Sequence, residues 1–244
     1  MEKRVAIITG ATKGIGRGLF LRLSSLGVNI ATIYHRDEKA AEEFKKDAEN
    51  AGVRCLIQKC NVSDYQGLCS FVEKTYNQFG RIDFLINNIG VDVFKKIEDV
   101  SWDEWKLSQD IILNAPVYLC KVVLPYMRMQ KFGRIVNIGA SSKDYYKGAP
   151  GLGPFGIHKA ALTVFTKTLA LEEIQNGITV NMVAPGSTRG AGSNPEEKRI
   201  PISQIPLGRR VEVEEVVDAI LYFLSNGAGA VTGQYIGVNG GLST

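Results

Sequence analysis

Short apolar runs and longer amphipathic segments alternate along the whole chain. The apolar runs are rich in branched residues, as is typical of strands buried on both faces of a parallel sheet. We expect strands at residues 5–9, 28–34, 53–59, 82–87, 133–139, 177–183 and 232–238. The segments between them show helical spacing, and we expect helices at residues 17–26, 39–51, 64–80, 102–124, 155–171 and 213–225. This alternation predicts a doubly wound α/β fold, with a seven-stranded parallel sheet and helices on both faces.

The first strand and the first helix enclose a glycine-rich turn, within the sequence VAIITGATKGIGRG. A strand, a glycine turn and a helix together present free backbone N–H groups and the positive end of a helix to a phosphate. Gly10 allows a tight turn, Gly14 lets the backbone approach a pyrophosphate, and Gly16 lets helix and strand pack closely. An ordinary turn between a strand and a helix is the alternative, but the flanking elements favour a dinucleotide site.

The end of the second predicted strand carries positive charge, where an acidic residue usually holds the free ribose 2′-hydroxyl of NAD. His35 and Arg36 follow this strand, and Lys13 lies in the glycine turn. Cations suit a 2′-phosphate, so we expect NADP(H), with NAD(H) as the less favoured cofactor. Asp37 is close by and weakens this preference. In the alternative interpretation, Arg36 is a solvated surface residue.

Composition narrows the classes of function. The 244 residues are 45% hydrophobic, which fits one α/β domain over residues 1–244, with two small domains as the less favoured alternative. The net charge of +4 is mild and evenly spread, so we expect no nucleic-acid partner. We expect no apolar stretch long enough to span a membrane, no signal peptide and no membrane partner, and hence a cytoplasmic protein. The four cysteines lack metal-ligand spacing, so we expect reduced thiols and no metal site.

The pattern Thr9-Gly10-x-x-x-Gly14-Ile15-Gly16 resembles that of the short-chain dehydrogenase/reductase family, and the resemblance runs through nearly the whole chain. It implies a single Rossmann-type doubly wound domain that binds NAD(P). It also implies that several turns contribute to the dinucleotide site. The residues that we expect there are Gly10, Thr12, Lys13, Gly14, Ile15, Gly16, His35, Arg36, Asn61, Val62, Asn88, Gly90, Lys159, Pro185, Gly186 and Thr188.

The resemblance assigns roles to the later members of this set. The Asn-Val pair at residues 61–62 stands where the family has Asp-Val against the adenine. Residues 88–90 match a turn that closes over the adenosine side of the cofactor, with Ile89 in place of the family's alanine. The Pro-Gly turn at residues 185–186 matches one that covers the nicotinamide, and Thr188 is the candidate partner of the carboxamide.

The family's reaction passes a hydride between the nicotinamide and a carbonyl carbon, supported by a Tyr-x-x-x-Lys pair on one helix face. Lys159 matches the lysine, which holds the nicotinamide ribose, but Phe155 stands at the tyrosine position. A phenyl ring cannot donate a proton or a hydrogen bond to a developing alkoxide. Ser141 and Ser142 are both candidates for the family's serine. Asn114, inside a predicted helix, matches an asparagine that holds a water of the proton relay.

Other groups are candidates to replace the missing phenol. Tyr145 and Tyr146 lie in a loop rich in glycine and proline, where a hydroxyl beside the Lys159 ammonium would have a lowered pKa. A wall of the substrate pocket or a subunit contact is an equally favoured role for these tyrosines. The longer Tyr-to-Lys spacing of related enoyl reductases falls on Leu152 here. His158 points about 100° around the helix from Lys159, so we expect it at the surface or at an interface.

Two classes of function remain open. The first is an NADP(H)-dependent reductase that resembles the 3-oxoacyl-[acyl-carrier-protein] reductases and acts on a small-molecule or acyl-thioester substrate. Reduction of a polarised C=C bond is a variant of it. The second is a catalytically impaired subunit that binds NADP(H) and assembles with an active relative as a hetero-oligomer. Residues 187–206 are expected to form a mobile substrate lid. Family members commonly form tetramers, so we expect a homotetramer, with a dimer as the alternative.

Overall fold

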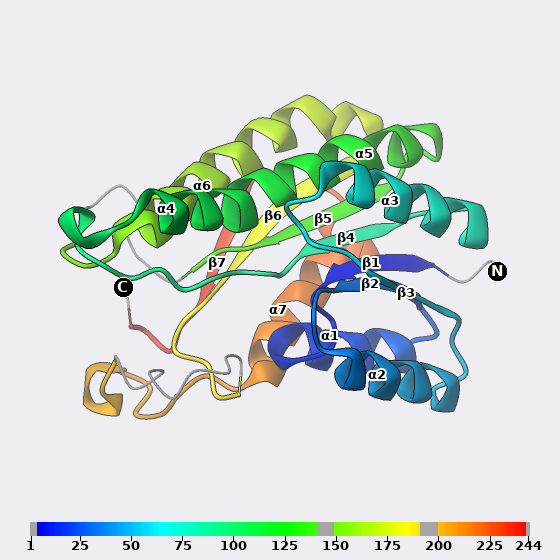
Figure 1. The fold of residues 1–244 in the computed structure, drawn as a ribbon. Coiled ribbons are helices and arrows are strands. Elements are labelled where there is room, and N and C mark those ends of the chain that lie inside the picture. Colours follow the sequence, from blue (N-terminus) through cyan, green and yellow to red (C-terminus); the bar gives the residue numbers. More distant parts are fainter. Residues whose placement is uncertain (1–3, 141–148, 191–199, 243–244) are drawn as a thin grey trace.

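The computed structural model describes residues 4–140, 149–190 and 200–242 of the chain. The described residues form one sheet of seven parallel strands, in the order β3-β2-β1-β4-β5-β6-β7 (Figure 1). The strands are β1 (Val5–Thr9), β2 (Asn29–Tyr34), β3 (Cys55–Lys59), β4 (Phe84–Asn87), β5 (Gly133–Ile138), β6 (Ile178–Pro185) and β7 (Tyr235–Val238). The strand order changes direction between β1 and β4. Open α/β sheets bind ligands at such a point, beyond the carboxyl ends of the strands.

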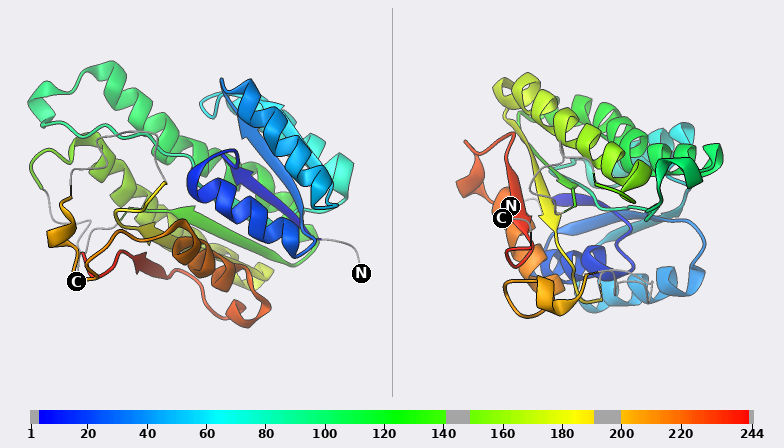
Figure 2. Two further views of the ribbon diagram at one scale, coloured as in Figure 1. Left: turned by 90° about the horizontal axis from the view of Figure 1, so that it is seen from below. Right: turned by 90° about the vertical axis from the view of Figure 1, so that its left-hand side faces the viewer.

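Helices cover both faces of this sheet, as Figures 1 and 2 show. One layer holds α1 (Gly14–Ser25), α2 (Glu38–Asn50) and α7 (Val213–Leu224). The other holds α3 (Tyr65–Phe79), α4 (Trp102–Gln109), η2 (Asp110–Asn114), α5 (Ala115–Met129) and α6 (Gly153–Glu173). The described residues also form short 3-10 helices, namely η1 (Ile97–Asp99), η3 (Ile174–Asn176), η5 (Ile202–Gln204) and η6 (Asn226–Ala228).

Each face of the sheet has its own apolar core. Phe20, Phe44 and Phe223 are fully buried beneath the layer of α1, α2 and α7. Phe71 and Val123 are fully buried on the opposite face. A sheet that is covered on both faces needs strands that are apolar on both faces, which accounts for the continuous apolar runs. The predicted fold class is confirmed.

Side-chain caps account for where several helices begin. Asp37 accepts a hydrogen bond from the N–H of Ala40 (3.0 Å) at the start of α2, and Asp64 caps α3 in the same way. Ser101 and Glu104 form a capping box at the start of α4. These caps satisfy N–H groups that a helix cannot pair internally, so the three helix starts are fixed locally.

The predicted helix at residues 102–124 consists of three segments. After α4, the π-helical turn η2 leads into α5, which continues to Met129. Asn114 is the last residue of the π turn, and Pro116 lies in the first turn of α5. The side chain of Asn114 can compete for backbone hydrogen bonds, and Pro116, two residues later, has no N–H group. Both features favour a local change of helix type.

The helical segment Trp102–Met129 is long and apolar enough to cross a membrane by length and composition alone, among the residues that the structure describes. The expectation that no apolar stretch has this length is therefore wrong. Of its most apolar window, 44% is buried inside the protein. Leu119, Val123 and Met127 of α5 pack into the core, so apolar character here also serves the contact with the sheet.

Candidate active site

The glycine turn after β1 is built for close backbone contact. Gly10 has a φ of +70° and Gly14 a φ of +54°, which favour glycine. A Cβ atom at Gly16 would overlap the Gly10 carbonyl oxygen and would lie 2.7 Å from Nδ2 of Asn88. The absence of a side chain at Gly16 therefore lets α1 approach the end of β1, as the sequence predicted.

The turns after β1 and β4 are tied together by side-chain hydrogen bonds. Nδ2 of Asn88 donates to the carbonyl of Thr9 (2.9 Å) and to that of Gly10 (3.4 Å). In return, Oγ1 of Thr9 accepts from the backbone N–H of Asn88 (2.9 Å) and of Ile89 (3.2 Å). The predicted cofactor residues Gly10 and Asn88 are therefore linked directly, although 78 positions separate them in the chain.

The first turn of α1 leaves its N–H groups available. Lys13 occupies the N-cap position in an extended conformation and makes no side-chain cap hydrogen bond. Ile15 and Gly16 are buried in this turn. Uncapped N–H groups and the helix dipole attract an anion, so this end of the helix fits the pyrophosphate of a dinucleotide.

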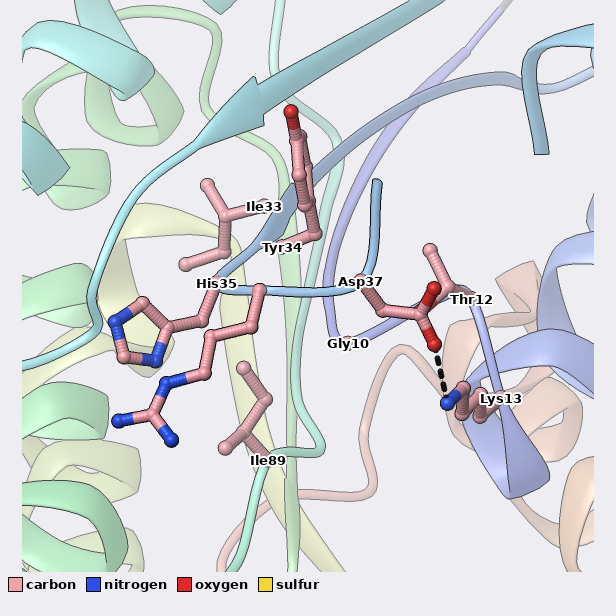
Figure 3. A pocket seen from close by; sticks show the side chains of 9 residues that line it. Gly10, Thr12, Lys13, Ile33, Tyr34, His35, Asp37 and Ile89 are labelled. Atoms are coloured by element: carbon pink, nitrogen blue, oxygen red, sulfur yellow. Dashed lines mark ion pairs between the residues drawn. The ribbon is translucent and has the colours of Figure 1, made fainter. Parts of the chain in front are cut away.

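A pocket of about 310 Å³ lies beside this turn and the end of β2 (Figure 3). Its lining residues are Gly10, Thr12, Lys13, Ile33, Tyr34, His35, Arg36, Asp37 and Ile89. The side chains of His35 and Arg36 are exposed, as is that of Lys13. Nζ of Lys13 lies 2.5 Å from Oδ2 of Asp37. The structure thus brings together the cations expected to meet a 2′-phosphate, and it pairs one of them with a carboxylate.

Lys159 of α6 is buried at the carboxyl end of β5. Its Nζ donates a hydrogen bond to the carbonyl of Ile138 (2.6 Å). Burial lowers the pKa of Lys159 to about 8, and the negative charge of Asp92 opposes this shift. A Cβ atom at Gly90 would lie 4.0 Å from Nζ. The ammonium group is therefore held where the turn after β4 meets the end of β5.

Phe155 lies one helical turn before Lys159 and faces the same way. The centroid of its ring is 5.8 Å from Nζ of Lys159 and 4.4 Å from the ring centroid of Phe94. Phe155 and Phe94 therefore present an apolar surface beside the ammonium group. A phenyl ring here can shape a pocket but has no proton to exchange.

Asn114 lies on the helical layer above the same edge of the sheet. Its Nδ2 donates to Oδ1 of Asp110 (2.8 Å), at the other end of the π turn. The π turn packs against α6, and its Ile111 lines a small cavity with Thr9. The role in holding a water that the resemblance implies for Asn114 stays a prediction.

The remaining predicted cofactor residues lie on turns at the carboxyl ends of β3, β4 and β6. Asn61 is exposed, with Oδ1 accepting from the N–H of Ser63 (3.1 Å), and Val62 is buried. Gly90 is exposed. Pro185 ends β6, the N–H of Gly186 donates to Val238, and Oγ1 of Thr188 donates to the carbonyl of Gly186 (3.0 Å). All these turns follow strands that end at one edge of the sheet, as the sequence predicted.

His158 is neither exposed nor directed to solvent, so the expected surface position is wrong. It is 3% exposed and lies between α6 and α4. Its Nδ1 lies 2.9 Å from Oγ of Ser108, and its ring meets the edge of Trp105 at a centroid distance of 4.9 Å. Burial lowers its pKa. The angle around the helix does not show what packs against that face, and α4 covers it.

Four candidate residues lie outside the described residues, namely Ser141, Ser142, Tyr145 and Tyr146. The same is true of residues 191–199, the centre of the predicted lid. The predictions for these residues stay predictions. Within the described part of this segment, Thr188 forms a β-bridge with Val211.

Two residues of the site, Asp92 and Phe94, are not among those that the sequence predicts. Both belong to the segment that follows β4, and this segment crosses the start of α6. A Cβ atom at Gly153 would lie 3.2 Å from the Lys95 backbone nitrogen. An aromatic residue such as Phe94 after a strand can be noticed in the sequence, but only the fold shows that its ring contacts that of Phe155.

Comparisons with known proteins agree with this geometry. The family described as Enoyl-(Acyl carrier protein) reductase matches residues 10–243. The 3-oxoacyl-[acyl-carrier-protein] reductase FabG of Haemophilus influenzae is 34% identical over 248 residues, which cover 99% of this chain and 99% of that protein. The acetoacetyl-CoA reductase of Shinella zoogloeoides is 35% identical over 243 residues, which cover 98% of each chain.

Solved structures show the same fold. The crystal structure of acetoin dehydrogenase YohF from Salmonella typhimurium superposes with a TM-score of 0.87 at 30% identity. The match covers 98% of this chain and 96% of that one. The likeness therefore extends over the sheet, the helices and the turns that carry the candidate site.

Proposed function

Because this chain belongs to the short-chain dehydrogenase/reductase family, we propose that it is an NADP(H)-dependent reductase of 3-oxoacyl thioesters. The observation that carries the proposal is the position of Lys159, whose Nζ is fixed by Ile138 beside the turn at Gly90. The names of FabG from Haemophilus influenzae and of acetoacetyl-CoA reductase from Shinella zoogloeoides support a thioester-linked keto substrate.

The proposed choice of NADP(H) rests on charge in the pocket beside the glycine turn. Lys13, His35 and Arg36 line this pocket, and a guanidinium can bind a phosphate through two N–H groups. The N–H groups of the first α1 turn would hold the pyrophosphate. The ribose and carboxamide of the nicotinamide would meet Lys159 and Thr188, in accordance with the resemblance.

The residues of this chain would then support the reaction in three ways. The bound nicotinamide supplies the hydride. Lys159, protonated at neutral pH, stabilises negative charge on the substrate oxygen and provides a proton from its ammonium group or through a water held by Asn114. The rings of Phe155 and Phe94 limit the access of water beside this group. Tyr145 and Tyr146 are proposed as alternative proton donors, and Ser141 or Ser142 as the partner of the substrate oxygen.

Phe155 also favours a second candidate function, the reduction of a polarised C=C bond. In that reaction the proton arrives separately at carbon, so the site needs no phenol beside the hydride acceptor. The third candidate is an impaired subunit that binds NADP(H) and assembles with an active relative. It is favoured by the same residue, because the loss of a general acid costs about 10²- to 10⁴-fold in rate.

A panel of 3-oxoacyl and enoyl thioesters with NADPH separates these candidates. The expected result is oxidation of NADPH, followed at the nicotinamide absorbance, with a 3-hydroxyacyl product identified by mass spectrometry. A saturated product from the enoyl substrate alone would support C=C reduction. Tight binding of NADPH without turnover of either class would reject the reductase and support the impaired subunit.

We also propose that the chain forms a homo-oligomer, a tetramer or a dimer. Ile157, Val164 and Leu171 lie seven residues apart on one face of α6 and are 47%, 50% and 78% exposed. Such an apolar stripe is typical of a helix that packs against a second copy. Light scattering of the purified chain is expected to give a dimer or tetramer, and Val164→Glu should shift it towards monomer. A monomeric parent protein would contradict the proposal.

A further inference from the structure

A line of hydrogen bonds between buried side chains runs from β4 through β5 to α6. Nδ2 of Asn87 donates to Oδ1 of Asn137 (2.8 Å), and Nδ2 of Asn137 donates to Oγ1 of Thr166 (2.8 Å). The hydroxyl of Thr166 donates in turn to the carbonyl of Leu162, one turn earlier in α6 (2.8 Å). Asn137 is 0% exposed and Thr166 is 1% exposed. The two side chains therefore depend on each other for their hydrogen bonds.

The direction of this line follows from what each group can donate. A threonine hydroxyl has one proton, and that of Thr166 goes to Leu162, so Thr166 can only accept from Asn137. Asn137 must then turn its Nδ2 toward α6 and its oxygen toward Asn87, its paired residue on β4. The amide of Asn137 therefore has a single orientation, in which it connects β5 with α6.

Lys159 lies on the same face of α6, seven residues before Thr166. Its Nζ donates to the carbonyl of Ile138, the residue that follows Asn137 in β5. Two neighbouring residues of β5 thus hold two points of α6 that lie roughly 10 Å apart along the helix axis. The backbone of α6 packs chiefly against β6 (Figure 1), so side-chain hydrogen bonds carry much of its attachment to β5.

We propose that Asn137 and Thr166 are positioning residues, which hold α6 at the distance from β5 at which Nζ of Lys159 meets the Ile138 carbonyl. Both act through α6, because their side chains are buried where this helix meets the sheet. The catalytic meaning of the inference rests on the proposed function, in which Lys159 acts on the substrate oxygen. The position of Nζ can be measured without that function.

The geometry gives the direction of the effect. The hydrogen bond lets Nδ2 of Asn137 approach Oγ1 of Thr166 to 2.8 Å. A methyl group in place of this hydroxyl needs about 3.5 Å, so α6 must retreat by about 0.7 Å in Thr166→Val. Nζ of Lys159 then moves away from the Ile138 carbonyl. The gap is too narrow for a water molecule to enter and take the place of that carbonyl.

The charge on Lys159 reports this movement. Burial lowers its pKa to about 8, and Asp92, in the segment after β4, opposes the shift. The carbonyl of Ile138 accepts a hydrogen bond from the ammonium group and so supports its charge. When this hydrogen bond weakens, the protonated form becomes less stable. The pKa of Lys159 should therefore fall by roughly 0.5–1 pH unit in Thr166→Val.

Carbon-13 NMR of the lysine side chains in the full chain measures this pKa, and the signal of Lys159 is identified by its loss in Lys159→Met. Thr166→Ser keeps the hydroxyl and should keep the parent pKa. The matched control is Thr75→Val on α3, because Thr75 is also fully buried and donates to the carbonyl of Phe71 one turn earlier (2.8 Å). This control should lose stability as Thr166→Val does, measured by thermal unfolding, but should leave the pKa of Lys159 unchanged.

Asn137→Ala breaks the same hydrogen bond from the side of β5, so it should also lower the pKa of Lys159 and carries the test if Thr166→Val does not fold. An unchanged or raised pKa of Lys159 in these two variants would overturn the inference. An equal fall in Thr75→Val would overturn it as well, because the effect would then follow any loss of stability.

Steady-state assays with NADPH and a 3-oxoacyl thioester add the catalytic readout. The decline of kcat at high pH should begin at a correspondingly lower pH in Thr166→Val but not in Thr166→Ser, since the reaction needs the protonated Lys159. Equal pH profiles of kcat in these two variants would contradict the catalytic meaning of the inference. If the parent chain shows no turnover while the pKa falls as expected, the proposed function is wrong and the positioning role stands.

Discussion

Replacement of Gly16 by alanine is a strict test of the glycine turn. The added Cβ would overlap the Gly10 carbonyl oxygen and lie 3.0 Å from the Gly10 carbonyl carbon. Carbon atoms in ordinary contact are about 3.5–4.0 Å apart, so the turn must retreat by about 0.5–1 Å. Overpacking of this kind costs about 1–3 kcal/mol of stability. The higher helix propensity of alanine returns up to about 1 kcal/mol.

The displaced atoms belong to the same turn that would hold the pyrophosphate, so binding should suffer as well as stability. We expect Gly16→Ala to lose tenfold or more in NADPH affinity, which corresponds to about 1.4 kcal/mol or more. The assay is a fluorescence titration at a temperature at which the variant is folded. Urea unfolding of the same sample gives the change in the free energy of unfolding.

Gly18→Ala is the matched control in the same helix. Its Cβ would lie 2.5 Å from Cγ1 of Val213 on α7, a side-chain contact remote from the turn. This variant should therefore lose stability through the contact between α1 and α7 but keep NADPH affinity within about twofold. Equal NADPH affinity in Gly16→Ala and Gly18→Ala would refute the assignment of the turn to the pyrophosphate.

Three further predictions concern α6. Phe155→Tyr places a hydroxyl beside Nζ of Lys159, and we expect carbonyl reduction to rise by at least tenfold in a steady-state NADPH assay; no rise would show that the phenol is not what limits the reaction. Burial lowers the pKa of Lys159 to about 8, so the unfolded chain binds the extra proton between pH 8 and its ordinary 10.5, and stability rises with pH across this window. Lys159→Met should reduce this rise in urea unfolding followed across the window, and an identical pH profile would contradict it. Burial also lowers the pKa of His158 from 6.5, so stability is lost as the pH falls below 6.5. His158→Gln can still form a hydrogen bond with Ser108, and we expect its melting temperature to fall less between neutral and acidic pH than that of the parent chain. An equal fall in thermal melts of the two proteins would count against this role.

Much of the fold was predictable from the sequence because buried parallel strands leave a strong signal. The apolar runs identified all seven strands, and the glycine-rich sequence identified the turn after β1 as part of the candidate site. The ends of elements were less accurate. The strand expected at residues 232–238 begins only at Tyr235. Thr232, at the start of the predicted strand, instead pairs through its side chain, since its Oγ1 accepts a hydrogen bond from the N–H of Val180 (3.0 Å).

The site itself was predictable only in part. Turns at the ends of parallel strands meet at one edge of the sheet, so residues such as Asn88 and Lys159 could be grouped from their motifs. Contacts between particular side chains could not be predicted in this way. The pairing of Lys13 with Asp37 and that of Phe94 with Phe155 depend on the packing of distant segments. Periodicity within one helix carries no information about what lies across from it.

The central claim is that this site transfers a hydride from a nicotinamide to an acyl-thioester carbonyl beside Lys159. The most direct test uses NADPH that carries deuterium at the transferable C4 position, with a 3-oxoacyl thioester as the substrate. Mass spectrometry of the product should show one deuterium on the new carbinol carbon, and Lys159→Met should greatly reduce its yield. A chain that binds both molecules but produces no deuterated alcohol would contradict the claim.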